Sequence, residues 1–306
     1  MADRPNILLI FTDQQRWDTL GAYGNRAIKT PNLDRMAAEG AVFDNAITPC
    51  PVCLPARTCT ITGYTAGRLG CLNNTEPRDA NQQDSLAVYL SRAGYQTQAI
   101  GKMHFSGTPK KYTYGMQDMV VSEETRGLRR ANQPDDIVFD DYDKFLIENG
   151  MWGWDKPTEI GYNEIKPVMN GLPPEYHVTR WCADRTIDWL KNRRLKDRPF
   201  FLWTSFVKPH APYDCPSHLL DLYKPEDIPG PWVSEQDGTS KNPVFEEERM
   251  QREFELYSEH AARLSKAYYY ANITFIDEQI GRIFNTLHVE GLAGDTLVLF
   301  TSDHGD

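Results

Sequence analysis

Cysteine is scarce in this sequence, and long hydrophobic runs are absent from it. Six cysteines among 306 residues are too few for a fold built on disulfides. No apolar run approaches the roughly 20 residues that span a bilayer, and the start "MADRPNILLIFTDQQRW" lacks a signal-peptide cleavage pattern. We therefore expect a cytoplasmic protein that does not enter a membrane.

Positive charge is also in short supply. There are 33 Lys and Arg residues against 43 Asp and Glu residues, a formal net charge of -10. This balance argues against nucleic acid or an anionic membrane surface as a partner. The apolar content of 40% is ordinary for a globular protein, so the chain can bury a sizeable core. Composition leaves the oligomeric state open.

Short apolar runs alternate with helical patterns along the chain. Strands are predicted at residues 6–11, 96–102, 199–207 and 295–300, and those at 6–11 and 199–207 are expected to be buried. Helices are predicted at 30–40, 84–95, 178–193 and roughly 248–290. This order predicts an α/β fold, a three-layer α/β/α sandwich around a largely parallel sheet. Residues 107–175 are interpreted as a loop-rich insertion and 208–247 as a second polar loop.

Polar side chains follow each predicted strand. They are Asp13 with Gln14, Lys102 with His104, Lys208 with His210, and Asp303 with His304. The carboxyl ends of parallel strands share one edge of a sheet, so these groups can converge there. Each pair alone would be explained by a cap or a turn. Together, the carboxylates, amide and imidazole of the first and last pairs predict a site for calcium, magnesium or manganese.

The segment "TPCPVCLPARTCTITG" at residues 48–63 allows two interpretations. Cys50 and Cys53 could form a redox pair or half of a zinc site, but no second pair at zinc-ligand spacing follows. Alternatively a helix begins at or just after Cys53, which places Arg57 four residues on along the same face. The free N–H groups at that helix N-terminus would then bind an anion and activate Cys53 as a nucleophile.

These motifs resemble the formylglycine-dependent sulfatases of the alkaline-phosphatase-like superfamily. The resemblance runs from "RPNILLIFTDQQRWDTLGAYGN" through "CLPARTCTITG", "GKMH", "KPHAPY" and "FTSDHGD". It implies one catalytic domain over residues 1–306, with the site lysine and the small C-terminal subdomain that family members carry beyond this point missing from the sequence. We therefore do not expect the chain alone to turn over substrate efficiently.

The resemblance also implies the cofactors. A maturation enzyme would oxidise Cys53 to formylglycine, whose hydrated form supplies the nucleophilic oxygen. Asp13, Gln14, Asp303 and His304 would hold one divalent ion in contact with residue 53. Ca²⁺ is the first choice for that ion, with Mn²⁺ and Mg²⁺ as alternatives.

The remaining roles follow from the same resemblance. Arg57 would stabilise the modified side chain, while Lys102 and His210 would bind the sulfate. His210 would also protonate the leaving alcohol. His104 would take the proton of the second hydroxyl, so that the aldehyde reforms as sulfate departs. The reaction implied is hydrolysis of a small-molecule or saccharide sulfate ester.

The sequence departs from the usual sulfatase pattern at two positions. Gln14 stands where many sulfatases have aspartate, and His304 where they often have asparagine. Glutamine and histidine at these two positions resemble the pattern of the phosphonate monoester and phosphodiester hydrolases of the superfamily. Asn74 also matches a substrate-binding asparagine of those enzymes. Lys102 and His104 favour sulfate instead. The alternatives are therefore a phosphonate or phosphodiester hydrolase, or a truncated module that binds sulfate without cleaving it.

Four aromatic residues of the predicted insertion could contact a substrate. Tyr112, Tyr114, Trp152 and Trp154 could stack on a sugar or aryl ring. They could equally form a small core of the insertion itself, which is the interpretation we favour.

Overall fold

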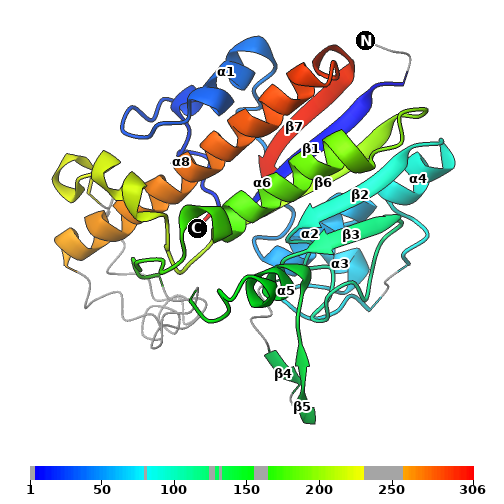
Figure 1. The fold of residues 1–306 in the computed structure, drawn as a ribbon, viewed down its shortest axis with the longest axis horizontal. Helices are drawn as coiled ribbons and strands as arrows, with labels where there is room; N and C mark the ends of the chain where they lie inside the picture. Colours follow the sequence, from blue (N-terminus) through cyan, green and yellow to red (C-terminus); the bar gives the residue numbers. More distant parts are fainter. Residues whose placement is uncertain (1–3, 79–80, 124–127, 131–132, 155–164, 231–257) are drawn as a thin grey trace.

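A five-stranded sheet forms the centre of the molecule (Figure 1). The structure is a computed structural model that describes residues 4–78, 81–123, 128–130, 133–154, 165–230 and 258–306. Every neighbouring pair of strands is parallel, in the order β3-β2-β6-β1-β7. The strands are β1 (Asn6–Asp13), β2 (Gln96–Gly101), β3 (Asp118–Val121), β6 (Phe200–Pro209) and β7 (Thr296–Ser302).

Alternation along the central strands builds two apolar layers. In β1, Leu8 and Ile10 pack into one core, while Leu9 and Phe11 pack into the other. The first core is covered by α1 (Pro31–Glu39), α5 (Asp141–Glu148), α6 (Val178–Asp188) and α8 (Glu259–Val289). The second is covered by α2 (Cys53–Thr62) and α4 (Leu86–Arg92). Figure 1 shows α6 and α8 in front of the sheet and α2 behind it. The predicted three-layer α/β/α fold is confirmed.

Most predicted elements are present with nearly the predicted bounds. Thr30 and Gly40 flank α1, and the Ser85 side chain caps α4 by accepting the Val88 N–H. The helix predicted over 178–193 is α6 followed by a π-helical turn, Trp189–Arg193. The long helix predicted over 248–290 is α8, and residues 248–257 lie outside the described part of the chain.

The segment 107–175, predicted as a loop-rich insertion, also contains short regular elements that the sequence did not predict. The segment contributes β3 to the main sheet, the helix α5, and a small antiparallel pair, β4 (Leu128–Arg130) with β5 (Gln133–Val138). β3 is only 4 residues long and is ordered by pairing with β2, so its own pattern was too short to predict it. Short helical turns complete the fold: α3 (Ala66–Leu69), Gly21–Tyr23, Pro174–Tyr176, Ser217–Leu222, Pro225–Asp227 and Ala293–Asp295.

One glycine is required where two strands end together. Gly101, the last residue of β2, has φ 95°, and a Cβ there would lie 1.9 Å from the Ser205 carbonyl oxygen of β6. This close approach is open only to glycine. It brings the residues that follow β2 against those that end β6.

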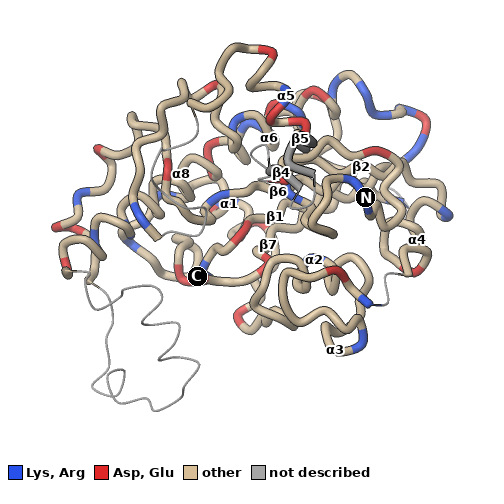
Figure 2. Tube along the Cα trace, turned by 90° about the horizontal axis from the view of Figure 1, so that it is seen from below, with Lys and Arg blue, Asp and Glu red and all other residues tan. Residues whose placement is uncertain are grey.

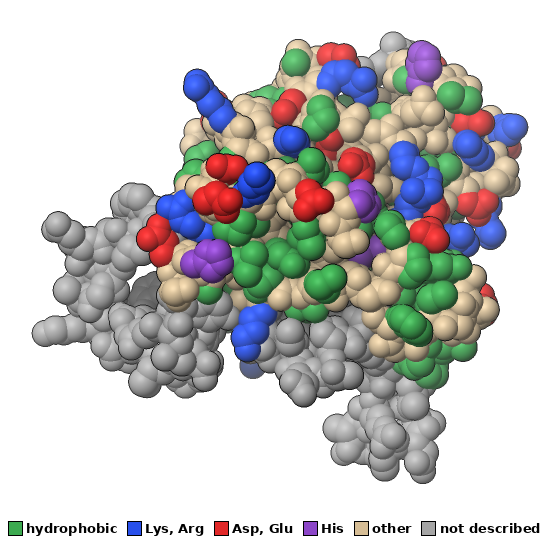
Figure 3. Space-filling view, turned by 60° about the vertical axis from the view of Figure 1, so that its left-hand side comes forward, with side chains coloured by type: hydrophobic (Ala, Val, Ile, Leu, Met, Phe, Trp, Pro, Cys, Tyr) green, Lys and Arg blue, Asp and Glu red, His purple; other side chains and the backbone are tan. Residues whose placement is uncertain are grey.

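The surface carries both signs of charge. Figure 2 shows acidic and basic positions scattered over the outer elements, and Figure 3 shows them interspersed with hydrophobic side chains on one face. Among the described helices, none combines the length and hydrophobicity that a bilayer crossing requires.

Candidate active site

The strand ends converge as the parallel sheet predicts. Ligand atoms of Asp13, Cys53, Asp303 and His304 all lie within 4.8 Å of one another. Asp13 ends β1 and Asp303 follows β7, the neighbouring strand. The cluster is a possible metal-binding group, because two buried carboxylates and an imidazole supply ligands that divalent cations accept.

Cys53 is the first residue of α2 and is 7% exposed. Its Sγ lies 3.3 Å from His304 Nε2 and 3.7 Å from Asp13 Oδ1. The helix has no side-chain cap of its own, because Val52 stands at the N-cap position. Instead the Leu54 N–H donates to Asn74 Oδ1 at 3.1 Å. Asn74, predicted to bind substrate, thus caps the helix that presents Cys53.

Cys50 is directed into a different environment from Cys53. It packs in a small apolar cluster with Cys59 and Cys71, where burial raises the pKa of the Cys59 thiol to about 11. All six cysteines are free thiols. This arrangement does not support a redox pair between Cys50 and Cys53.

Arg57 is fully buried at the centre of the site. Its guanidinium donates to Asp303 Oδ2 at 2.9 Å, to Asp13 Oδ2 at 3.2 Å, to Ser205 Oγ at 2.8 Å and to the Lys102 carbonyl at 2.5 Å. Burial opposes its charge, but the two carboxylates outweigh burial and raise the pKa of Arg57. Arg57 therefore connects four neighbouring strands, or the residues that follow them, through one planar group.

Lys102 also pairs with the Asp13 carboxylate. Its Nζ lies 2.5 Å from Asp13 Oδ2, and both side chains are buried. Burial alone would raise the pKa of Asp13, but Lys102 and Arg57 hold that pKa well below its usual range. Asp13 is therefore ionised, as a metal ligand must be.

Gln14 has left-handed backbone, with φ 63°. Its N–H donates to Asp303 Oδ1 at 2.9 Å, and its carbonyl accepts from the Tyr269 hydroxyl of α8 at 2.6 Å. The side-chain nitrogen of Gln14, Nε2, donates to Asp306 Oδ1 at 2.5 Å. These contacts keep Gln14 beside the cluster after β1 ends.

The chain turns at His104, shortly after β2 ends. The backbone of His104 is left-handed, with φ 48°, and its N–H donates to Glu123 Oε2 at 2.7 Å. Burial raises the pKa of Glu123 to about 7, against the effect of this hydrogen bond. Glu123 thus anchors the turn that carries His104.

His210 follows β6 and is 9% exposed. Its Nδ1 lies 2.7 Å from the Ala211 carbonyl oxygen, so Nδ1 carries the hydrogen. His210 also contributes to the lowering of the pKa of Asp13. Lys208, which the sequence places among the polar residues that follow the strands, pairs with Asp214 at 2.5 Å.

The aromatic residues of the 107–175 segment are mainly packing residues. Tyr114 is fully buried, and Tyr112 packs against the same core. Trp152 packs against the core on the other face of the sheet. Trp154 is 62% exposed.

Sequence reasoning missed several residues that support the site. They are Glu123, Ser205, Asp214 and Tyr269. No motif marks them, because each becomes relevant only through a contact with a residue distant in the chain. Glu123 and Tyr269 bind the two left-handed turns described above.

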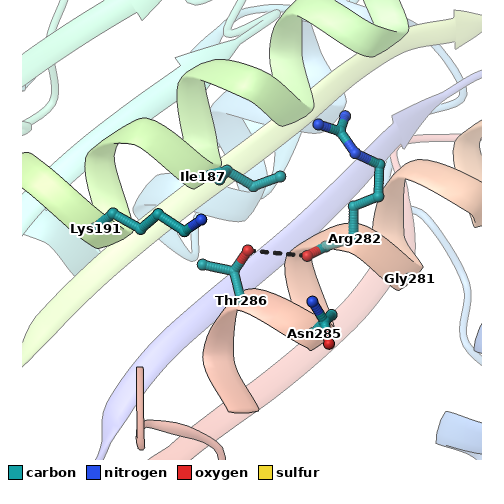
Figure 4. A pocket seen from close by; sticks show the side chains of 6 residues that line it. All are labelled: Ile187, Lys191, Gly281, Arg282, Asn285 and Thr286. Atoms are coloured by element: carbon teal, nitrogen blue, oxygen red, sulfur yellow. Dashed lines mark hydrogen bonds between the residues drawn. The ribbon is translucent and has the colours of Figure 1, made fainter. Parts of the chain in front are cut away.

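A groove lies between α8 and the segment formed by α6 and the π-helical turn that follows it (Figure 4). It has a volume of about 420 Å³ and is lined by Ile187, Lys191, Gly281, Arg282, Asn285 and Thr286. These residues precede the beginnings of β6 and β7. The groove therefore lies away from the strand ends that form the cluster.

Comparison with known proteins identifies the family. The Sulfatase family matches residues 5–306, and the chain belongs to the sulfatase family. It is 36% identical over 313 residues to an arylsulfatase of Clostridium perfringens, covering 99% of this chain and 63% of the relative. It is 30% identical to the multifunctional alkaline phosphatase superfamily protein PehA of Trinickia caryophylli, covering 99% of this chain and 63% of that protein.

A solved structure supports the same fold. The phosphonate monoester hydrolase of Agrobacterium radiobacter matches with a TM-score of 0.78 and 25% identity, over 99% of this chain and 63% of that one. The predicted alkaline-phosphatase-like fold and sulfatase resemblance are confirmed. The chain spans about 63% of the length of these relatives.

Proposed function

We propose that this chain forms the active site of a sulfuric ester hydrolase in which residue 53 acts as formylglycine. The observation that carries the proposal is the position of Cys53. Its Sγ stands 3.3 Å from His304 Nε2 and 3.7 Å from Asp13 Oδ1, at the N-terminus of α2. The sulfur stands for the oxygens of the hydrated aldehyde that a maturation enzyme would create there.

The donor set fits a divalent cation. Asp13, Gln14, Asp303, His304 and modified residue 53 would hold it, with Ca²⁺ as the ion that best suits an oxygen-rich set. The ion would lower the pKa of the nucleophile and offset charge on the sulfate. The support is chemical: Asp13 and Asp303 are buried and close together, and Arg57 balances part of their charge.

The catalytic steps are assigned to this chain's own residues. One hydroxyl of the hydrated aldehyde loses its proton to solvent and attacks sulfur, and the S–O bond to the alcohol breaks. His210 protonates the departing alcohol oxygen, while Lys102 and His210 bind the sulfate oxygens. His104 then removes the proton of the second hydroxyl, the carbonyl reforms, and sulfate leaves. Arg57 keeps the nucleophile and both aspartates in register.

The class of substrate proposed is a sulfate monoester of a small molecule or saccharide. Gln14 and His304, with the likeness to a phosphonate monoester hydrolase, favour phosphonate monoesters or phosphodiesters as the second candidate. A third candidate is a module that binds a sulfated ligand without cleaving it.

Mass spectrometry of the tryptic peptide from Met36 to Arg57 tests the nucleophile. In protein produced with a maturation enzyme, we expect the thiol of Cys53 to be replaced by an aldehyde oxygen, while Cys50 in the same peptide stays a thiol. A Cys53→Ala variant is the matched control. An intact Cys53 thiol, or a bond to Cys50, would overturn the proposal.

Kinetics separate the three candidates. The converted protein is assayed on a sulfate monoester and a phosphonate monoester that share a leaving group. A larger kcat/KM for the sulfate supports the sulfatase, and a larger value for the phosphonate supports the second candidate. Binding of the sulfate ester without release of sulfate supports the binding module.

A further inference from the structure

Lys208 is a buried lysine close to the site that the proposed reaction does not use. It lies near the end of β6 and is 1% exposed. Burying an ammonium group is unfavourable unless oxygen atoms surround it. The contacts that compensate it therefore indicate what Lys208 does.

Three oxygens of one turn surround the ammonium of Lys208. Its Nζ donates to the His210 carbonyl at 3.1 Å and to the Pro212 carbonyl at 2.8 Å. Asp214 Oδ1 lies 2.5 Å away and supplies the compensating charge. An ammonium has three N–H groups, and all three contacts fall within residues 208–214. Lys208 thus closes this turn from the inside.

The turn is also attached to the surrounding structure. Asp214 Oδ2 accepts from Asn170 Nδ2 at 3.2 Å, and the Asp214 carbonyl oxygen is 3.1 Å from His177 Nε2. Tyr213 forms a bridge with Pro167. The far end of the turn therefore has a fixed position, and Lys208 connects that end to β6.

The orientation of the His210 ring depends on this turn. His210 Nδ1 bonds the Ala211 carbonyl at 2.7 Å, and the carbonyls on either side, those of His210 and Pro212, both bind Lys208. Three successive carbonyls are thus engaged, one by the imidazole and two by the ammonium. Loss of the ammonium would release the peptide groups that orient the imidazole.

We propose that Lys208 is a positioning residue that holds the 208–214 turn so that the His210 ring faces the leaving group. The proposal rests on the proposed function, in which His210 protonates the departing alcohol. Lys208 itself does not touch the substrate. A lysine that merely stabilised the fold would affect all substrates alike, whereas a positioning residue for a general acid would not.

The test compares aryl sulfates whose phenols differ in pKa. A poor leaving group needs protonation and a good one does not, so loss of general acid catalysis steepens the dependence of kcat/KM on leaving-group pKa. We expect His210→Ala to lower kcat/KM about 100-fold more for the poorest leaving group than for the best. Lys208→Met should act in the same direction by about 10-fold. Lys191→Met, in the distant groove, should leave the dependence unchanged.

Two additional measurements keep the test decisive. If Lys208→Met does not fold, Lys208→Met with Asp214→Asn removes both charges together and should fold with the same steepened dependence. Imidazole ¹⁵N–¹H spectra should show a protected Nδ1–H of His210 in the wild type and in Lys191→Met. That signal should be lost in both Lys208 variants.

The outcomes separate the two proposals. A parallel loss for all leaving groups in the Lys208 variants, with His210→Ala steepening the dependence, overturns the positioning role alone. An unchanged Nδ1–H signal in those variants does the same. A parallel loss in His210→Ala overturns the acid role of His210 and the inference with it.

Discussion

Arg57 shows how much of this site one side chain can organise. It is buried with two carboxylates, a hydroxyl and a carbonyl around it. The guanidinium is always charged and planar, so it fixes distances as well as balancing charge. Its neighbours Asp13 and Asp303 are both buried, and Arg57 pairs with each of them, while Lys102 also pairs with Asp13.

Replacing Arg57 by methionine should therefore destabilise the protein strongly. The variant leaves two buried carboxylates without this partner, and we expect a loss of roughly 3–5 kcal/mol in the free energy of unfolding. Urea denaturation measures it. Arg193→Met is the control, because that arginine pairs with Asp188 on the surface and its loss should change stability by about 1 kcal/mol or less. Equal effects of the two substitutions would contradict this account.

His177 predicts a pH dependence of stability. The residue is 1% exposed; its Nδ1 accepts the Thr179 N–H and its Nε2 faces the Asp214 carbonyl. Burial lowers the pKa of His177 from 6.5 to about 4. Between these values the unfolded chain binds a proton that the folded protein does not, so stability falls as the pH drops from 6.5 to 4.

The expected loss attributable to His177 across that window is about 3 kcal/mol. It is measured as the difference in free energy of unfolding between wild type and His177→Gln at several pH values. The difference should be constant above pH 6.5 and should shrink as the pH falls from 6.5 to 4. A constant difference across the window would show that the proton on His177 is not involved.

At the scale of elements, the long helix α8 supports the loop that follows β1. Tyr269 of α8 is buried, donates to the Gln14 carbonyl at 2.6 Å and accepts the Arg16 N–H at 2.9 Å. Its ring packs edge-to-face on Tyr213, with centroids 5.2 Å apart. One hydroxyl thus holds Gln14 in its left-handed conformation beside Asp303.

Tyr269→Phe should weaken metal binding without removing any ligand. Loss of the hydroxyl frees the Gln14 backbone, and partners behind metal ligands are worth about 10- to 100-fold in metal affinity. Calorimetric titration with Ca²⁺ measures this. Tyr268→Phe alters a partly buried neighbour on the same helix and should leave the affinity unchanged. Unchanged affinity in Tyr269→Phe would exclude a role for the hydroxyl.

At the scale of the whole molecule, the sheet gathers charge at one edge. The chain has a net charge of -10, yet its buried carboxylates Asp13 and Asp303 are held together by a few buried cations. Those carboxylates come from β1 and the end of β7, and the cations from α2 and the end of β2. An ion bound there would connect the ends of β1 and β7 in the sheet to α2 in the helical layer beside it.

Metal binding should therefore raise the stability of the entire fold. With free Ca²⁺ at about 100 times its dissociation constant, the expected gain is about 2.7 kcal/mol, seen as a higher thermal midpoint. A chelator should reverse it. Asp303→Asn removes a ligand and should abolish the response; a similar rise in that variant would place the ion elsewhere.

Much of the fold was readable from the sequence because two of its central strands are largely apolar runs. Residues 6–11 and 199–207 had to be buried on both faces, and their polar ends had to meet at one edge. The helix beginning at Cys53 followed from Pro55 in its first turn. By contrast, β3 was not predicted, since a strand of 4 residues takes its order from pairing with β2.

The sequence by itself determined the family, the layered α/β fold and the identities of the chemical groups near the strand ends. Only the tertiary structure decided how those groups are divided between roles. It placed Asn74 as the cap of α2, separated Cys50 from Cys53, and turned Lys208 inward to Asp214. The physical reason is that motifs record local spacing, whereas burial, charge balance and hydrogen bonding depend on residues brought together from distant parts of the chain.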